Sequence, residues 1–246
     1  MEFRPERMKW LDLSFPTPAA NLACDEALLE SCEAGIISDT LRFWESPNYF
    51  VVVGYGNSVA TEVRIETCAA KQIPILRRCS GGGTVVQGPG CLNYSLVLNY
   101  SDHSPLRNIT SANQFIMERN RAALEQLTGK PVAICGHTDL AIEGVKFSGN
   151  AQRRKRRTLL FHGALLLNFD LALIGELLPM PSQEPDYRLH RAHQNFLRNL
   201  ELPAATVKAA LRVAWQAADV MADIPTEVIA SLVRDKYATA DWNFKF

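Results

Sequence analysis

The hydrophobic pattern of the first hundred residues predicts one helix followed by strands. Residues 17–35 repeat apolar side chains at helical spacing, and Thr17, Pro18 and Gly35 stand where a cap, a first turn and a stop are expected. Apolar runs of strand length follow, two of them within 41–56, separated at 46–48, and shorter ones at 73–76, 84–86 and 93–98. This half of the chain is therefore expected to be rich in β-structure.

The second half returns to helices after further strands. Ser111 and Gln114 have the spacing of a capping box and predict the start of a helix that ends near Gly129. The remaining expected elements are a hairpin over 139–149, a buried strand over 158–169, and helices over 207–221 and after Pro225. Strands interleaved with helices in this manner predict an α+β fold in which helices cover a sheet.

Composition narrows the class of protein. The chain has 246 residues, of which 47% are hydrophobic and 21% charged, as in ordinary globular proteins. Lys plus Arg and Asp plus Glu number 26 each, so no net charge draws the chain toward nucleic acid or an anionic membrane. Without an apolar leader or an apolar run long enough to span a bilayer, we expect a cytoplasmic protein with no membrane partner. The six cysteines lie far apart and predict reduced thiols, not a zinc site.

The stretch RRCSGGGTVVQGPG, residues 77–90, contains three consecutive glycines, so three neighbouring positions have no side chain. A P-loop is excluded because Gly83 is followed by Thr84 and Val85, where that motif needs Lys and Ser or Thr. One interpretation is a bare loop, flanked by two arginines, that lies against a flat or anionic ligand. The other is a tight turn or bulge between strands.

A second group of polar residues lies in GVKFSGNAQ and in the strand after it. Lys146 is expected in a strand and is followed by Ser148 and Gly149, while the next strand carries His162 and Gly163. An inward-facing lysine is a point charge suited to an anionic transition state. A strand lysine is also commonly a solvated edge residue, so these residues leave both interpretations open.

Taken together, these motifs resemble the lipoate-protein ligase A family, within the biotin/lipoate ligase and octanoyltransferase superfamily. The resemblance runs from WLDLSFPTPAANLACDEALLE through RFWESPNYFVVVGYGN, RRCSGGGTVVQGPGCLNYS, DLAIEGVKFSGNAQ and LLFHGALLLNFDL to KYATADWNF. It implies a central mixed β-sheet flanked by helices, and one catalytic domain over 1–246. It also implies activation of lipoate by ATP to lipoyl-AMP, followed by transfer of the lipoyl group to a lysine of a carrier domain.

The same resemblance assigns roles to individual residues. Lys146 would be the catalytic residue, acting on the carboxylate and the α-phosphate by its charge. Contacts to the acyl-adenylate are implied for Arg78, Ser80, Gly81, Gly82, Gly83, Thr84, Val85, Asn93, Asp139, Ser148, Gly149, His162, Gly163 and Ala164. Trp44, Val53 and Gly54 would help to form a tunnel for the lipoyl chain, and Tyr187 and Arg188 lie in a segment expected near the active site. ATP with Mg²⁺ and lipoate would be substrates, and no tightly bound cofactor is expected.

The chain also departs from the family pattern. Gln87-Gly88 and Gly90-Cys91 replace the His-Asp and Gly-Asn pairs common in these ligases, which leaves metal contacts there unassigned. We expect no C-terminal accessory domain after the catalytic domain. Adenylation would then involve a separate accessory chain.

Two other functions compete with ligation. One branch of the superfamily transfers octanoyl groups through a cysteine in the loop before the lysine motif, and Cys135 lies in that loop. Cys135 is only 11 residues before Lys146, however, which is closer than expected for that branch. The glycine motif of this chain, SGGG, is also more like that of the ligases than the TGGR usual in the transferase branch. From outside this class, the basic run 153–157 could indicate a nucleic-acid-binding module, although no recognition motif accompanies it. The same run could instead steer acidic carrier domains or ATP.

Overall fold

The computed structural model describes residues 8–100 and 104–246, and its main feature is an eight-stranded mixed sheet. The strand order is β11-β1-β2-β6-β10-β9-β8-β7, with parallel pairing at β11/β1 and β1/β2 and antiparallel pairing elsewhere. The strands are β1 (Lys9–Asp12), β2 (Thr40–Glu45), β6 (Cys91–Asn99), β7 (Ala133–Cys135), β8 (Asp139–Ile142), β9 (Val145–Arg154), β10 (Thr158–Leu166) and β11 (Asp219–Val220). The expected α+β fold with a central mixed sheet is confirmed.

A second, three-stranded sheet holds the segment that leads into the glycine motif. Its order is β4 (Ile75–Arg77), β3 (Phe50–Val53), β5 (Val85–Gln87), and β3 pairs in parallel with β4 and antiparallel with β5. The two apolar runs of 41–56 thus enter different sheets. The glycine-rich loop connects β4 to β5 and lies where the small sheet meets the large one.

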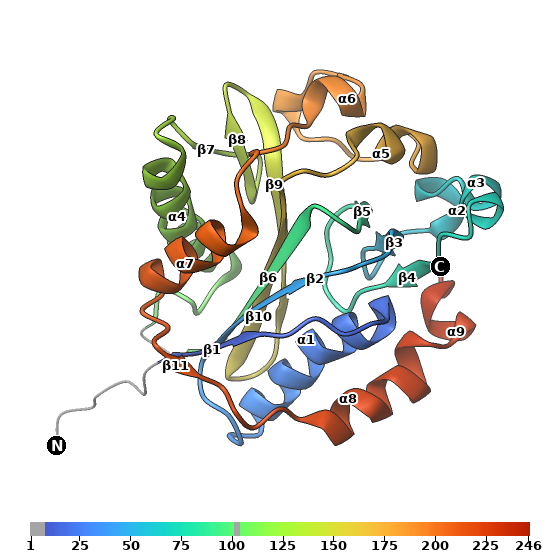
Figure 1. Ribbon diagram of the computed structural model, residues 1–246. Coiled ribbons are helices and arrows are strands. Elements are labelled where there is room, and N and C mark those ends of the chain that lie inside the picture. Colours follow the sequence, from blue (N-terminus) through green and yellow to red (C-terminus); the bar gives the residue numbers. More distant parts are fainter. Residues whose placement is uncertain (1–7, 101–103) are drawn as a thin grey trace, which may run out of the picture.

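Helices cover both faces of the large sheet (Figure 1). One face packs against α4 (Ile109–Thr128) and α7 (Ala204–Ala214), and the other against α1 (Pro18–Glu33) and α8 (Thr226–Leu232). The remaining short helices are α2 (Val59–Glu62), α3 (Ile65–Ala70), α5 (Leu171–Leu177), α6 (His193–Phe196) and α9 (Ala240–Asn243), with a 3₁₀ turn at Asp186–Arg188 and a π turn at Val233–Tyr237. A third apolar cluster joins the small sheet to α2, α3 and α5.

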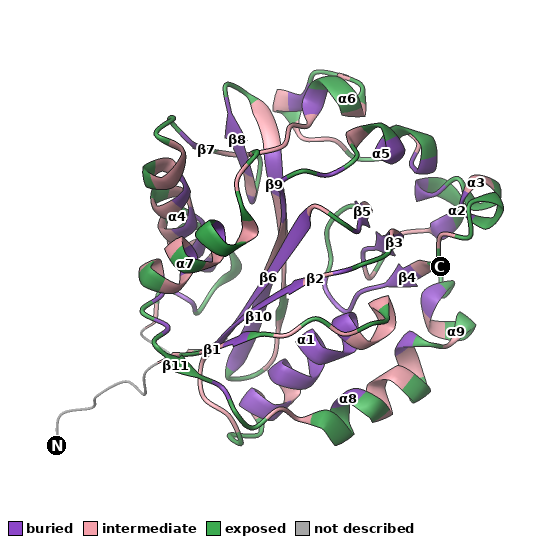
Figure 2. Ribbon diagram, in the orientation of Figure 1, coloured by how far each residue is buried: buried purple, intermediate pink, exposed green. Residues whose placement is uncertain are grey.

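Helix α1 is buried on nearly every side, as Figure 2 shows. Its start is the one expected, because the Thr17 hydroxyl accepts a hydrogen bond from the Ala20 N–H and Pro18 fills the first turn. Its buried residues include the polar Asn21, Asp25 and Glu26. Polar side chains are rarely buried in a protein core unless they are paired, so each of these three residues is expected to have a polar partner nearby.

Two expected helix boundaries are wrong. Helix α4 does not begin at a Ser111–Gln114 capping box, because Asn108 is the cap and its side chain accepts from the Ser111 N–H at 2.8 Å. The helix expected over 207–221 ends at Ala214. Gln216 adopts φ +52°, which breaks the helix, and the chain then runs beside β1, where the Met221 N–H donates to the Trp10 carbonyl.

The β8–β9 hairpin and the strand that follows it form as expected. The hairpin between β8 and β9 turns at Glu143 and Gly144, both with positive φ, and the strand expected over 158–169 forms over Thr158–Leu166, between β6 and β9. All six cysteines are free thiols, and Cys135 is the least buried of them. Among the described residues, no helix is both long and apolar enough to cross a membrane.

Candidate functional site

The glycine-rich loop, residues 78–84, lies against the small sheet on one side and against β9 on the other. Its approach to β3 is so close that a Cβ on Gly54 would lie 2.0 Å from the Gly82 carbonyl oxygen. Gly82 has φ +87°, which favours glycine, whereas added Cβ atoms on Gly81 and Gly83 would meet nothing within 4 Å. Gly54 and Gly82 are therefore required by the protein itself, and the space beside Gly81 and Gly83 is open.

The buried side chain of Arg78 stabilises this loop by hydrogen bonds. Its buried guanidinium donates to the carbonyls of Gly81 and Gly83, at 2.6 and 2.7 Å, and to the Ser80 hydroxyl at 3.1 Å. Burial lowers the pKa of Arg78 to about 10, so the group stays charged at neutral pH. Because the C=O and N–H of a trans peptide point in opposite directions, the N–H groups of Gly82 and Thr84 are turned away from Arg78. The loop thus presents outward-facing donors suited to an anion.

Arg77, the other arginine beside the loop, faces a different way. Its guanidinium donates to the carbonyls of Gly54, Tyr55 and Asn57 and to that of Trp242 in α9. It therefore ties the C-terminal helix α9 to the end of β3, and Arg77 takes no part in holding the glycine loop.

Beneath the loop, the large sheet presents a polar strip. The register pairs His162 of β10 with Ser95 of β6 and Ala151 of β9, and Ala164 with Asn93 and Gly149. Residues that pair across strands share a face, so these side chains point to the same side of the sheet. A Cβ on Gly82 would lie 3.5 Å from the Ala151 Cβ, which places the loop directly over this strip.

A chain of contacts runs from the loop into the core. The Ser80 hydroxyl lies 2.5 Å from His162 Nε2, and His162 Nδ1 lies 3.3 Å from Asp25 Oδ2. The other carboxylate oxygen of Asp25 lies 2.5 Å from the Arg42 guanidinium, with both side chains almost completely buried. Burial alone would raise the pKa of Asp25, but Arg42 and the contact with His162 hold it below its usual value.

Lys146 lies in a more open part of the same face. A β-bulge, an extra residue in β9, separates the pairs Leu140–Ser148 and Ala141–Lys146, and bulges redirect side chains. The ammonium group lies over Gly149, where an added Cβ would be only 2.8 Å from Nζ. Its partner is Asp139 Oδ1, at 2.8 Å, and 23% of the lysine side chain is exposed. Gly149 thus leaves the space that Lys146 occupies.

Tyr187 covers this ion pair. Its hydroxyl donates to Asp139 Oδ2 at 2.8 Å, and its pKa is raised by burial and by that carboxylate. The ring packs on Phe196, and Arg191 donates to the Tyr187 carbonyl. The segment around Tyr187, expected near the active site from the resemblance, lies beside Lys146.

Cys135 lies at the end of β7, opposite Asp139 in the register. Burial raises the pKa of its thiol, and the Asp139 carboxylate raises it further. The charge of Lys146 is directed at Asp139, not at the sulfur. In this arrangement the thiolate, which is the nucleophilic form, is disfavoured at neutral pH.

Ser148 and Gly163, two residues expected to contact the adenylate, lie on the opposite face. An added Cβ on Gly163 would collide with the Asn150 side chain, which accepts from the Tyr94 hydroxyl at 2.5 Å. Ser148 is buried and its hydroxyl lies 3.4 Å from Asn150 Nδ2. These residues therefore make room for a polar network under α4, and any ligand contact by them would use the backbone.

The residues expected to form a lipoyl tunnel belong to two apolar clusters. Trp44 is buried with α1 and stacks on Phe50, with ring centroids 6.4 Å apart. Val53 is buried in the cluster under α2, α3 and α5. Gly54 serves the approach of the glycine loop. The tunnel remains a prediction.

The basic run 153–157 covers the end of β9 and the turn to β10, and most of its side chains contact other parts of the protein. Lys155 pairs with Glu30 at 2.6 Å, Arg157 donates to the Glu33 carbonyl, and Arg154 donates to the carbonyls of Leu106 and Arg107. Arg153 and Arg156 are exposed. The run is thus mainly a clamp on the C-terminal end of α1, which does not favour nucleic-acid binding.

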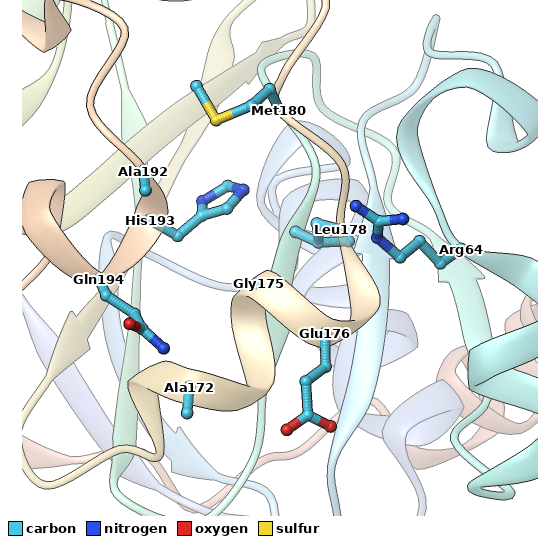
Figure 3. A pocket seen from close by; sticks show the side chains of 9 residues that line it. All are labelled: Arg64, Ala172, Gly175, Glu176, Leu178, Met180, Ala192, His193 and Gln194. Atoms are coloured by element: carbon cyan, nitrogen blue, oxygen red, sulfur yellow. The ribbon is translucent and has the colours of Figure 1, made fainter.

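A separate cavity of about 330 Å³ lies between α5, α6 and the segment before α3 (Figure 3). Its wall contains none of the residues expected at the site and is mainly apolar, with the charged side chains of Arg64 and Glu176 beside Leu178. His193 faces it, and burial lowers the pKa of this imidazole. Glu176 is paired with Lys71.

The sequence did not point to Asp25 or Arg42, and it placed Tyr187 near the site without identifying its partner. Asp25 and Arg42 are 17 residues apart and meet because α1 packs across β2. One signal was available: Asp25 follows Asn21 by four residues in the predicted helix, so both polar groups share a face. Among the described residues, no group of three or more His, Cys, Asp or Glu side chains could hold a metal ion.

Residues 17–224 match the family model described as the lipoyl protein ligase A/B catalytic domain. The octanoyltransferase LipM of Geobacillus kaustophilus is 26% identical over 277 aligned positions, covering 98% of this chain and 99% of that protein. A putative lipoate-protein ligase A of Aeropyrum pernix is 34% identical over 164 positions, covering 66% and 58% of the two chains.

Solved structures share the fold. A lipoate-protein ligase A bound with ATP superimposes with a TM-score of 0.84 at 24% identity, covering 97% of this chain and 98% of that one. The bi-partite lipoate protein ligase of Thermoplasma acidophilum, described together with its E2 lipoyl domain, gives 0.82 at 23% identity, covering 97% and 96%. The expected mixed-sheet architecture is the architecture of these proteins.

Proposed function

This chain belongs to the lipoyl protein ligase A/B catalytic-domain family and is an enzyme, a lipoate ligase or a related acyltransferase, and we propose that it is the ligase. In this proposal it joins lipoate to ATP, forming lipoyl-AMP, and passes the lipoyl group to a lysine of a carrier domain. The site residues named from the resemblance are part of the same proposal.

One observation carries the proposal: two groups suited to an anion share a face of β9. The glycine loop, whose Gly82 N–H points away from Arg78, passes over Ala151 at Gly82, and the Lys146 ammonium lies over Gly149. Two residues of strand separate these points by roughly 7 Å. A phosphate and an adjoining carboxylate fit between them, with backbone donors on one side and a point charge on the other.

The chemistry needs mainly electrostatic assistance. A lipoate carboxylate oxygen attacks the α-phosphorus of ATP, and the bond to pyrophosphate breaks. The carrier lysine then attacks the acyl carbon as a neutral amine, AMP leaves, and the amine proton passes to solvent. Lys146 would reduce the repulsion between the two anions in the first step and stabilise the developing charge in the second. For this its ammonium would exchange Asp139 for the ligand.

A second candidate is octanoyl or lipoyl transfer through Cys135, favoured by the names of the LipM relatives. It requires a thiolate, whereas burial and Asp139 raise the pKa of Cys135. A carrier bound beside Cys135 would have to displace the Asp139 charge. We therefore place this activity second.

Mass spectrometry of a lipoyl carrier domain separates the two candidates. The protein is incubated with lipoate and Mg-ATP, with synthetic lipoyl-AMP, or with octanoyl carrier protein without ATP. We expect a lipoyl mass gain in the first two reactions, reduced about 10²–10³-fold in Lys146→Ala and retained in Cys135→Ala. Lys71→Ala, which removes an exposed lysine far from the site, is the matched control.

The other outcomes are distinct. Octanoyl gain without ATP, abolished in Cys135→Ala, would replace the ligase by the cysteine transferase. Gain from lipoyl-AMP but not from lipoate with ATP would indicate that activation needs an accessory chain, as the bi-partite T. acidophilum neighbour suggests. Octanoyl gain that survives Cys135→Ala would contradict both candidates.

A further inference from the structure

The buried pair of Asp25 and Arg42 is unusual enough to need an explanation beyond packing. Its side chains are 3% and 0% exposed, yet both carry charge. The two terminal nitrogens of Arg42 also donate to the carbonyls of Leu13 and Asn21 and to the Asn21 side chain, at 2.8–3.0 Å, whereas its buried Nε has no partner among the described residues. Because a buried ion pair is often no more stabilising than apolar residues of similar volume, stability alone does not account for it.

The two oxygens of the Asp25 carboxylate have different partners. Oδ1 faces Arg42 at 2.5 Å, and Oδ2 faces His162 Nδ1 at 3.3 Å. An ionised carboxylate only accepts hydrogen bonds, so Nδ1 of His162 has to carry a proton. In the neutral imidazole, Nε2 is then the acceptor.

This assignment also sets the direction of the next hydrogen bond. Since Nε2 accepts, the Ser80 hydroxyl donates to it across 2.5 Å, and the Ser80 oxygen in turn accepts from Arg78 Nε at 3.1 Å. Each hydrogen bond in the series from Arg42 to Arg78 consequently has a defined donor and a defined acceptor. The last of them, Arg78, holds the carbonyls of Gly81 and Gly83.

We propose that Asp25 and Arg42 are positioning residues: through the Nδ1–H tautomer of His162 they fix the Ser80 hydroxyl and the outward face of the glycine loop. The order carboxylate, imidazole, hydroxyl is that of a hydrolase triad. Ser80, however, is completely buried and holds a hydrogen bond from Arg78, so it cannot attack a substrate. This series of hydrogen-bonded side chains orients the glycine loop and takes no part in bond making.

The inference rests on the proposed function only in treating the loop as an element that contacts the ligand. Its first test needs no substrate. With ¹⁵N-labelled histidine, two-bond ¹H–¹⁵N spectra of the intact protein report which ring nitrogen of His162 carries the proton, and His162→Gln identifies the signal. We expect the Nδ1–H tautomer in the wild type and in Ser80→Ala, and its loss in Asp25→Asn.

Glu26→Gln is the matched control. Glu26 is the neighbouring buried acid of α1, but it pairs with Lys236 and Tyr237, not with His162. It should leave the His162 spectrum unchanged. If Asp25→Asn does not fold, Ser80→Ala and the wild type still decide the question, because an Nε2–H tautomer in either would overturn the proposal.

Kinetics then test whether Asp25 acts through His162. We expect Asp25→Asn to raise KM for the acyl substrate about tenfold with a smaller change in kcat, as expected for loss of a hydrogen bond to a charged group. The same substitution in a His162→Gln background should add no further loss. Losses that multiply would show that Asp25 acts independently and would overturn the inference. Wild-type protein with the Nδ1–H tautomer but no acyl transfer would contradict the proposed function alone.

Discussion

The two sides of the glycine loop differ in how firmly their charged groups are held. On the α1 side, Asp25 and Arg42 are buried, and their partners leave them one arrangement. On the β8–β9 side, Lys146 and Asp139 are 23% and 14% exposed and meet each other under Tyr187. The first side holds the backbone donors of the loop in place, and the second keeps a charge that a ligand can take over. In the proposed function the loop would bind the ligand and needs fixed geometry, whereas the Lys146 ammonium would have to change partners.

The largest expected effect is on stability, from the buried side. Arg42→Met leaves the Asp25 carboxylate in the core without its main partner, so the free energy of unfolding should fall by about 3–5 kcal/mol. Urea denaturation measures this loss. Arg121→Met, which breaks surface pairs with Glu118 and Glu125 on α4, should cost less than about 1 kcal/mol. Equal losses would remove the distinction between the two kinds of ion pair.

A second prediction concerns the close approach that shapes the loop. In Gly54→Ala, the new Cβ would meet the Gly82 carbonyl oxygen at 2.0 Å, so the loop or β3 has to shift. We expect a loss of about 1–3 kcal/mol in unfolding free energy together with weaker substrate binding. Gly175→Ala is the control, because its Cβ would meet nothing within 4 Å in helix α5. A Gly54→Ala protein with wild-type KM would mean that the loop position does not matter.

The lowered pKa of Asp25 predicts a pH dependence. A carboxyl group with a folded-state pKa below its unfolded value of about 3.9 stabilises the protein above that value, and the contribution is lost as pH falls through the folded-state pKa. The stability advantage of the wild type over Asp25→Asn should therefore be constant between pH 6 and 8 and shrink below about pH 4. Chemical denaturation across this range measures it, and an advantage that grows on acidification would reverse the assignment.

The smallest effect is expected on the open side. Tyr187→Phe removes the hydrogen bond to Asp139, which is worth about 1 kcal/mol, and frees that carboxylate to hold Lys146 more tightly. We expect kcat/KM to fall less than tenfold with little change in melting temperature. Tyr49→Phe, at a ring that packs edge-on against Phe169, is the control. A change as large as that from Lys146→Ala would show that Tyr187 has a direct part in the reaction.

Local elements near the site could be predicted because their causes are local. Thr17 and Pro18 start α1, Glu143–Gly144 turns the β8–β9 hairpin, and the glycines at 81–83 allow a bare loop. The capping box at Ser111 failed for an equally local reason, since Asn108 three residues earlier is itself a strong cap. Competing signals of this kind are separated only by which hydrogen bonds form.

The sequence by itself determined the family and the α+β class, because motif spacing and hydrophobic period depend on neighbours along the chain. Only the tertiary structure decided which face each residue serves. Strand register puts His162 under the loop and the adjacent Gly163 on the opposite side, and a bulge brings Lys146 over Gly149. The packing of α1 across β2 joins Asp25 to Arg42. Such contacts depend on distances between segments remote in sequence, which no local pattern specifies.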